Sequence, residues 1–214
     1  MKILKKKRFY IFSLCLISFL IITIMVLKSN ILGIDKIGYD FIKEHLIRDE
    51  FTPVVKVLTD LGGSVILIVI SSILYFVIKD KRISYGIIGN LIISVLLNLG
   101  IKALFQRERP LIDNRLIDVI GYSFPSGHAM VSMAFYGFLI YLAYVYWNNK
   151  KYKWPIIILL MVIILIIGTS RIYLGVHYLS DVLAGYLISI SYLIVYVYGF
   201  NLVLKKYGIG KAIS

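Results

Sequence analysis

The side chains in this sequence that could do chemistry gather in three short segments, over residues 102–110, 125–128 and 170–181. These segments hold two of the three histidines, several cations, a Pro-Ser-Gly turn and a carboxylate four residues after a histidine. A histidine beside a carboxylate can act as a nucleophile or a base, and cations bind the oxygens of a phosphoryl group. Phosphoryl transfer is therefore the chemistry that these residue types indicate.

His177 and Asp181 supply the reactive pair. They are four residues apart, so on one helical face the carboxylate can accept a hydrogen bond from one ring nitrogen. The other ring nitrogen is then free to attack an electrophile. The plainer alternative is a surface pair of neighbouring helical side chains.

Positive charge and donor groups come from the other two segments. Lys102, Arg109 and Arg171 can hold a phosphoryl group, and the fork of an arginine suits two phosphate oxygens at once. Ser126 and Gly127 directly precede a predicted helix, where hydroxyl and backbone N–H groups can bind the same anion. Taken singly, each has a structural explanation: interfacial cations, a charge at a helix end, or a turn with an N-cap.

Membrane-spanning helices must position these segments. Sixty per cent of the 214 residues are hydrophobic and only 16 per cent are charged, well below the quarter or so typical of soluble domains. Several apolar runs match the roughly 20 residues that cross a hydrocarbon core. We expect an all-α integral membrane bundle of six transmembrane helices near residues 9–27, 61–78, 83–101, 128–147, 155–170 and 180–204.

The distribution of basic residues predicts the orientation. The net charge is +13, and 14 of the 24 Lys and Arg lie in the ends and loops on one side of the predicted bundle. The positive-inside rule makes that side cytoplasmic, with both termini on it, and argues against nucleic-acid binding. The three chemical segments then lie on the extracytoplasmic face of the cell membrane. Helical spacing of apolar residues within 34–50 predicts an amphipathic helix on that surface.

Together the segments resemble the type 2 phosphatidic acid phosphatase (PAP2) family, whose relatives include the vanadium haloperoxidases. The family's motifs are Lys-x6-Arg-Pro, Pro-Ser-Gly-His and Ser-Arg-x5-His-x3-Asp. All eleven identities are present in order: Lys102, Arg109, Pro110; Pro125, Ser126, Gly127, His128; Ser170, Arg171, His177, Asp181. The resemblance implies a single domain of this kind over residues 1–214.

The resemblance also implies a role for each motif residue. His177 would attack phosphorus to form a phosphohistidine, with Asp181 holding its tautomer, and His128 would serve as general acid and then base. The phosphate-binding residues would be Lys102, Arg109, Ser126, Gly127 and Arg171. The supporting motif residues would be Pro110, Pro125 and Ser170. No metal or other cofactor is implied, because the cations would supply the charge that a metal brings.

The expected function is hydrolysis of a phosphomonoester or diphosphate on a membrane lipid. Among lipids the family resemblance favours undecaprenyl diphosphate, with phosphatidylglycerophosphate or phosphatidic acid as alternatives. A transporter or channel is the rival class, although it would be expected to carry charges near the midplane or broken helices in paired halves. A non-catalytic lipid-binding protein is a third possibility, and the intact His128, His177 and Asp181 argue against it. The sequence carries no signal for the oligomeric state.

Overall fold

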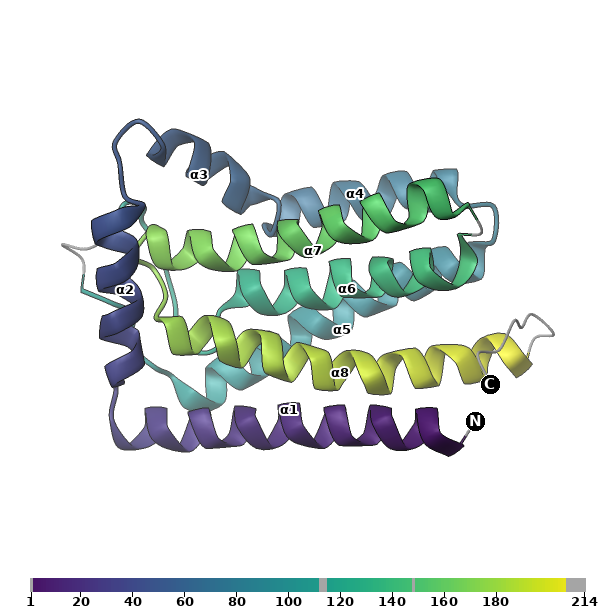
Figure 1. Ribbon diagram of the computed structural model, residues 1–214, viewed down its shortest axis with the longest axis horizontal. Helices are drawn as coiled ribbons and strands as arrows, with labels where there is room; N and C mark the ends of the chain where they lie inside the picture. The colour runs from purple at the N-terminus through teal and green to yellow at the C-terminus, as the bar shows by residue number, and fades with distance from the viewer. Residues whose placement is uncertain (1, 112–114, 148, 207–214) are drawn as a thin grey trace.

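Eight helices form the part of the chain that the computed structural model describes, residues 2–111, 115–147 and 149–206. They are α1 (Lys2–Lys28), α2 (Gly33–His45), α3 (Thr52–Asp60), α4 (Ser64–Val77), α5 (Lys81–Phe105), α6 (Gly127–Tyr146), α7 (Lys150–Tyr173) and α8 (Leu179–Lys206). Figure 1 shows α1, α6, α7 and α8 running alongside one another, with α2 crossing one end of the bundle. The start of α1 and the end of α8 lie at the opposite end.

Five of these helices are long and apolar enough to cross a membrane: α1, α5, α6, α7 and α8. Helices α3 and α4 pass the same test together, although the chain bends by 48° between them. Counting the bent pair as one span gives six. The predicted all-helical fold with up to six membrane-length segments is therefore confirmed, and the structure adds the bend between α3 and α4, which hydropathy did not reveal. Counted as one, this bent pair is called the broken second span below.

The break between α3 and α4 lies at Leu61–Gly63 and packs against two other helices. A Cβ atom on Gly62 would lie 2.6 Å from the side chain of Ile167 in α7, so only glycine allows this approach. The carbonyl of Leu61 accepts a 2.7 Å hydrogen bond from the Tyr136 hydroxyl of α6. This side chain compensates for a helical hydrogen bond that the bend removes, as apolar surroundings require.

Helix α2 covers most of the segment for which an amphipathic helix was expected. The side chains of Asp35 and Ile42 are buried, whereas Ile37 and Phe41 are exposed. The face toward the bundle therefore carries an acidic as well as an apolar residue, and the outward face carries exposed apolar ones. An apolar outward face is what a helix at a membrane surface would present to lipid.

Helix α6 is the centre of the bundle, because it packs against α5, α7 and α8. Its Phe135 and Phe138 are almost fully buried and join a core that includes Leu67, Ile87 and Ile167. Helix α1 packs on α8. Helix α7 begins at Lys150, five residues before the predicted start, because the Asn149 side chain caps it by accepting from the backbone N–H of Lys151.

Candidate active site

The three chemical segments meet at the end of the bundle that α2 crosses. Lys102 lies in the last turn of α5, and Ser126 is the N-cap of α6. Arg171 lies in the last turn of α7, and Asp181 lies in the first turn of α8. Antiparallel packing therefore gathers two helix ends and two helix starts in one place, with residues 106–126 as the connection between α5 and α6.

The ring of His177 is held at both nitrogens. On one side Nδ1 lies 3.4 Å from Oδ2 of Asp181 and 3.3 Å from the Ser123 hydroxyl. On the other side Nη1 of Arg109 lies 3.2 Å from Nε2. A guanidinium group can only donate, so Nε2 must accept and the ring proton must sit on Nδ1. The Nε2 lone pair of His177 thus points toward a cation and accepts a hydrogen bond from it.

Burial sets the charge of this histidine. The His177 side chain is almost fully buried, and this desolvation lowers its pKa from the ordinary 6.5 to about 3. The hydrogen bond and the charge of Asp181 oppose this shift, while Arg109 and Lys102 reinforce it. With its pKa this low, the imidazole is neutral near pH 7 and keeps the lone pair that a nucleophile needs.

Asp181 is fully buried and its carboxylate is saturated with donors. Oδ2 accepts from the Ser123 hydroxyl at 2.5 Å and from the backbone N–H of Tyr178 at 2.9 Å. Oδ1 accepts from Nη1 of Arg107 at 2.6 Å. The Ser123 oxygen can in turn accept from Nδ1–H of His177, so this hydroxyl bridges the pair. The Ser123 hydroxyl thus adds a second hydrogen-bonded connection to the long direct contact between His177 and Asp181.

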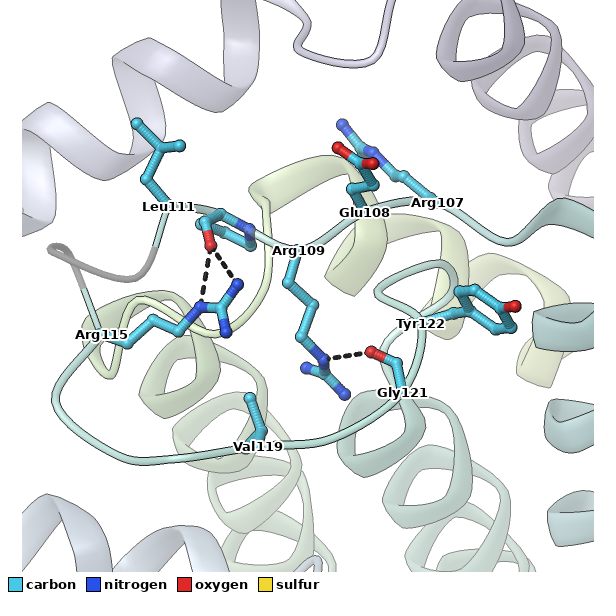
Figure 2. A pocket seen from close by; sticks show the side chains of 9 residues that line it. Arg107, Glu108, Arg109, Leu111, Arg115, Val119, Gly121 and Tyr122 are labelled. Carbon is cyan, nitrogen blue, oxygen red and sulfur yellow. Dashed lines mark hydrogen bonds between the residues drawn. The ribbon is translucent and has the colours of Figure 1, made fainter.

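Arg109 is fixed in place by backbone carbonyls of two loops. Its Nε donates to Gly121 O at 2.8 Å, the contact drawn in Figure 2, and Nη1 donates to Val176 O at 2.9 Å. Figure 2 shows this arginine projecting into an open pocket of about 630 Å³ between residues 107–111 and 115–122. Burial lowers the pKa of Arg109, and the charge of Asp181 opposes that effect.

The other two cations approach from α5 and α7. The ammonium group of Lys102 donates to the carbonyls of Tyr122 and Ser123. Nη1 of Arg171 donates to the Thr59 hydroxyl at 3.0 Å, and the same hydroxyl accepts from Ser170 at 2.8 Å. Thr59 lies in the last turn of α3, so the break brings a side chain to the site that no motif predicted.

The start of α6 offers further donors. The Ser126 side chain makes no capping bond, and its hydroxyl and the Nε of Arg171 are buried without a partner among the described residues. The backbone N–H of Ser126 donates to Asp181 O at 3.1 Å. A Cβ atom on Gly185 would lie 3.1 Å from the Ser126 carbonyl, so a small residue there lets α8 lie against this turn. Both unpaired donors are available for the oxygens of an anion.

His128 is the second residue of α6 and is partly buried. Its ring lies beside the break in the second span, because a Cβ atom on Gly62 would lie 3.4 Å from its Cδ2. The charges of Arg171, Arg109 and Lys102 act on it. The structure thus brings the two histidines, the carboxylate and the three cations that the sequence singled out into one cluster.

The remaining motif residues support this cluster from behind. The Pro110 carbonyl accepts from Nε of Arg115 at 2.8 Å, and the Pro125 carbonyl lies 3.4 Å from Nδ2 of Asn98 in α5. Ser170 contacts Thr59, as described above. Gly127 leaves room for Asn98, whose Oδ1 would lie 3.0 Å from a Cβ atom. Each of these residues shapes the backbone around the cluster.

Four residues that the sequence reading missed complete the site: Arg107, Asp35, Ser123 and Thr59. All four side chains contact a motif residue or one another through hydrogen bonds or ion pairs. Arg107 and Ser123 stand close to motifs in the sequence, and that proximity was the available signal. Asp35 and Thr59 lie far from any motif. Within the described residues no cluster of three or more His, Cys, Asp or Glu side chains is arranged to hold a metal ion.

Two curated proteins are similar to this chain in sequence. The chain is 34% identical over 113 residues to phosphatidylglycerophosphatase B of Bacillus subtilis, a match that covers 52% of this chain and 55% of the relative. It is 26% identical over 193 residues to an undecaprenyl-diphosphatase of Sulfolobus acidocaldarius, covering 85% of this chain and 87% of the relative.

Two solved structures share the fold. A transmembrane PAP2-type phosphatidylglycerolphosphate phosphatase from Bacillus subtilis superposes with a TM-score of 0.78 at 25% identity, over 91% of this chain and 98% of the other. Aquifex aeolicus LpxE superposes with a TM-score of 0.60 at 23% identity, over 75% and 92% of the respective chains. Residues 84–204, more than half of the chain and all three motifs, match the description of one family. On this evidence the chain belongs to the PAP2 superfamily.

Proposed function

We propose that this chain is a membrane phosphatase that hydrolyses a phosphomonoester or diphosphate of a lipid through a phosphohistidine intermediate. The observation that carries the proposal is the ring of His177. Its Nε2 lone pair faces Arg109 at 3.2 Å, while Nδ1 faces the buried carboxylate of Asp181. A neutral nucleophile aimed at a phosphate-binding cation is the arrangement that in-line attack on phosphorus requires.

In the first step Nε2 of His177 forms a bond to phosphorus and the bond to the leaving oxygen breaks. His128 gives its proton to that oxygen as the oxygen takes the bonding electrons. The phosphorylated ring becomes cationic, and Asp181 stabilises it from Nδ1. In the second step water attacks phosphorus, His128 takes its proton, and the P–N bond breaks to release phosphate and restore His177.

The surrounding donors stabilise the charge that builds up on the equatorial oxygens of phosphorus. These donors are Lys102, Arg109, Arg171, the Ser126 hydroxyl and the backbone of Gly127. The buried, unpaired Ser126 hydroxyl and Arg171 Nε support this role, because fixed donors in a water-poor site need no rearrangement when the transition state forms.

A lipid is the substrate that the setting favours, because the cluster lies at one end of a bundle of membrane-length helices that expose many large hydrophobic side chains. Undecaprenyl diphosphate is our first choice, supported by the relative that matches over most of both chains. Phosphatidylglycerophosphate is the second, supported by the solved structure with the higher TM-score. Phosphate release by the purified protein from a panel of lipid mono- and diphosphates decides between them. If the protein hydrolysed none of these lipids, the proposal would be refuted.

Catalysis is expected to need no divalent metal, because the three cations supply the charge at the phosphoryl group. Activity should survive EDTA and should be abolished by vanadate, whose trigonal-bipyramidal form mimics the transition state that the cations bind. Phosphate release from a lipid phosphate with and without each reagent measures both effects. Loss of turnover in EDTA with recovery in Mg²⁺ would contradict the mechanism.

The positive-inside distribution supports an active site on the extracytoplasmic face, with both termini in the cytoplasm. In a Cys15→Ser background, the variant Lys43→Cys, at an exposed position of α2, should react with an impermeant thiol reagent on intact cells. The variant Asn149→Cys, at the other end of the bundle, should react only after the cells are permeabilised. Labelling of Asn149→Cys alone on intact cells would invert the orientation.

A further inference from the structure

Arg107 occupies one of the unspecified positions of the first motif, Lys-x6-Arg-Pro, yet its guanidinium group touches the carboxylate of Asp181. Its Nη1 donates to Oδ1 of Asp181 at 2.6 Å and to the Ser180 hydroxyl at 2.7 Å. Its Nη2 donates to Oδ2 of Asp35 at 2.8 Å, and Nε donates to the Asn30 carbonyl at 3.0 Å. The guanidinium plane also lies 4.1 Å from the centre of the Tyr178 ring.

All five N–H donors of Arg107 are used within the protein, since Nη2 also donates to the Asn30 carbonyl. Its side chain is 1% exposed, and the side chains of both carboxylate partners are fully buried. No donor is left for a substrate phosphate. This distinguishes Arg107 from Arg109 and Arg171, and makes it a residue that acts through another.

Asp35 ties the same network to α2. Its Oδ1 accepts from the backbone N–H of Ser180 at 2.8 Å, and Oδ2 accepts from that of Leu32 at 3.0 Å as well as from Arg107. One carboxylate thus joins the start of α2 to the start of α8, where Asp181 lies. The amphipathic helix is therefore fastened to the reaction centre through two buried ion pairs.

We propose that Arg107, anchored by Asp35, is a positioning residue that fixes the carboxylate of Asp181 and so holds the Nδ1-protonated tautomer of His177. Occupation of Oδ1 by Arg107 keeps Oδ2 turned toward His177, Ser123 and Tyr178. Without it, Oδ1 would be buried without its cation and the carboxylate would be free to turn. The role rests on the phosphohistidine mechanism proposed above.

The test uses a charge-balanced double variant, Asp35→Asn with Arg107→Gln. Removing Arg107 alone would leave two buried carboxylates without their cation, which is strongly destabilising. The double variant removes one charge of each sign. We expect kcat for a lipid phosphate to fall on the order of 10²-fold, the size of effect that a misplacement of about 1 Å produces, with KM unchanged. Arg107→Lys keeps the charge without the fork and should recover only part of kcat.

Rapid-quench measurement of phosphoprotein formation from a labelled nitrophenyl phosphate separates positioning from folding. In a His128→Ala background, where slow hydrolysis lets the phosphoprotein accumulate, the double variant should form the phosphoprotein more slowly and to the same final amplitude as its His128→Ala parent. A lower amplitude at an unchanged rate would mean that Arg107 only supports the fold, and a raised KM with unchanged kcat would mean that it binds substrate. Either result overturns the proposal. Arg48→Gln, an exposed arginine between α2 and α3, is the matched control and should change neither rate nor amplitude.

The His128→Ala parent, in which the intermediate is expected to accumulate, tests the underlying mechanism separately. A parent that forms no phosphoprotein would refute the phosphohistidine mechanism. A parent and a double variant that form it at equal rates would refute only the role of Arg107.

Discussion

The variant His177→Ala is expected to release no phosphate from any substrate and to form no covalent phosphoprotein. The side chain that it removes is the one whose Nε2 faces Arg109, so no atom remains to take the phosphoryl group. Loss of a covalent nucleophile lowers kcat on the order of 10⁶-fold in a well-studied hydrolase, and a comparable loss is expected here. A nitrophenyl ester, with its better leaving group, should not restore activity.

His45→Ala is the matched control for this variant. His45 lies in α2, is exposed, and its Nδ1 contacts only the carbonyl of Phe41, so its loss should leave turnover unchanged. Phosphate release and acid-labile phosphoprotein are measured for both variants after thermal melting has shown that they are folded. Phosphoprotein that persists in His177→Ala would show that another residue is the nucleophile.

The variant His128→Ala should affect the two steps of the reaction differently, and its effect on the first step should depend on the leaving group. A lipid alkoxide is basic and needs a proton to depart, whereas a nitrophenolate departs without one. Phosphorylation of His177 by a nitrophenyl ester should therefore survive. Hydrolysis of the phosphohistidine should slow by about 10²- to 10⁴-fold, because water has lost its general base.

Rapid quench with labelled ester should show an acid-labile, base-stable phosphoprotein that accumulates in His128→Ala and is absent from His177→Ala. Turnover of a lipid phosphate should be lost in both. If the intermediate accumulated in His177→Ala and not in His128→Ala, the roles of the two histidines would have to be exchanged.

The sequence predicted the six membrane-length segments and the motif residues of the site because both signals are local. Apolar runs reveal spans, and the motifs lie at the ends of those runs. The pairing of Arg107 with Asp35 gave no such signal, since 72 residues separate them and Asp35 lies far from any motif. Their pairing arises only when α2 folds back over the start of α8. A charge among other charges on a loop looks solvated until the tertiary structure buries it.

The broken span was missed for a different reason. Hydropathy averages over a window, and residues 61–78 are apolar enough to be predicted as a helix whether or not the chain bends. The bend lies at Gly62 and Gly63, and Gly62 approaches the side chain of Ile167 and the ring of His128. Thr59, in the last turn before the bend, therefore stayed outside the predicted site although its hydroxyl contacts Arg171.

Because of the bend, the two helices of the second span pack against different neighbours. Helix α3, the part nearer the candidate active site, packs mainly on α7, whereas α4 packs mainly on α5. Spans adjust to thicker or thinner bilayers by tilting, and here each part can tilt with a different neighbour. The Thr59 hydroxyl in the last turn of α3 accepts from Arg171, which α7 carries. We therefore expect a change in hydrocarbon thickness that tilts α3 to be transmitted to Arg171 through its contact with α7.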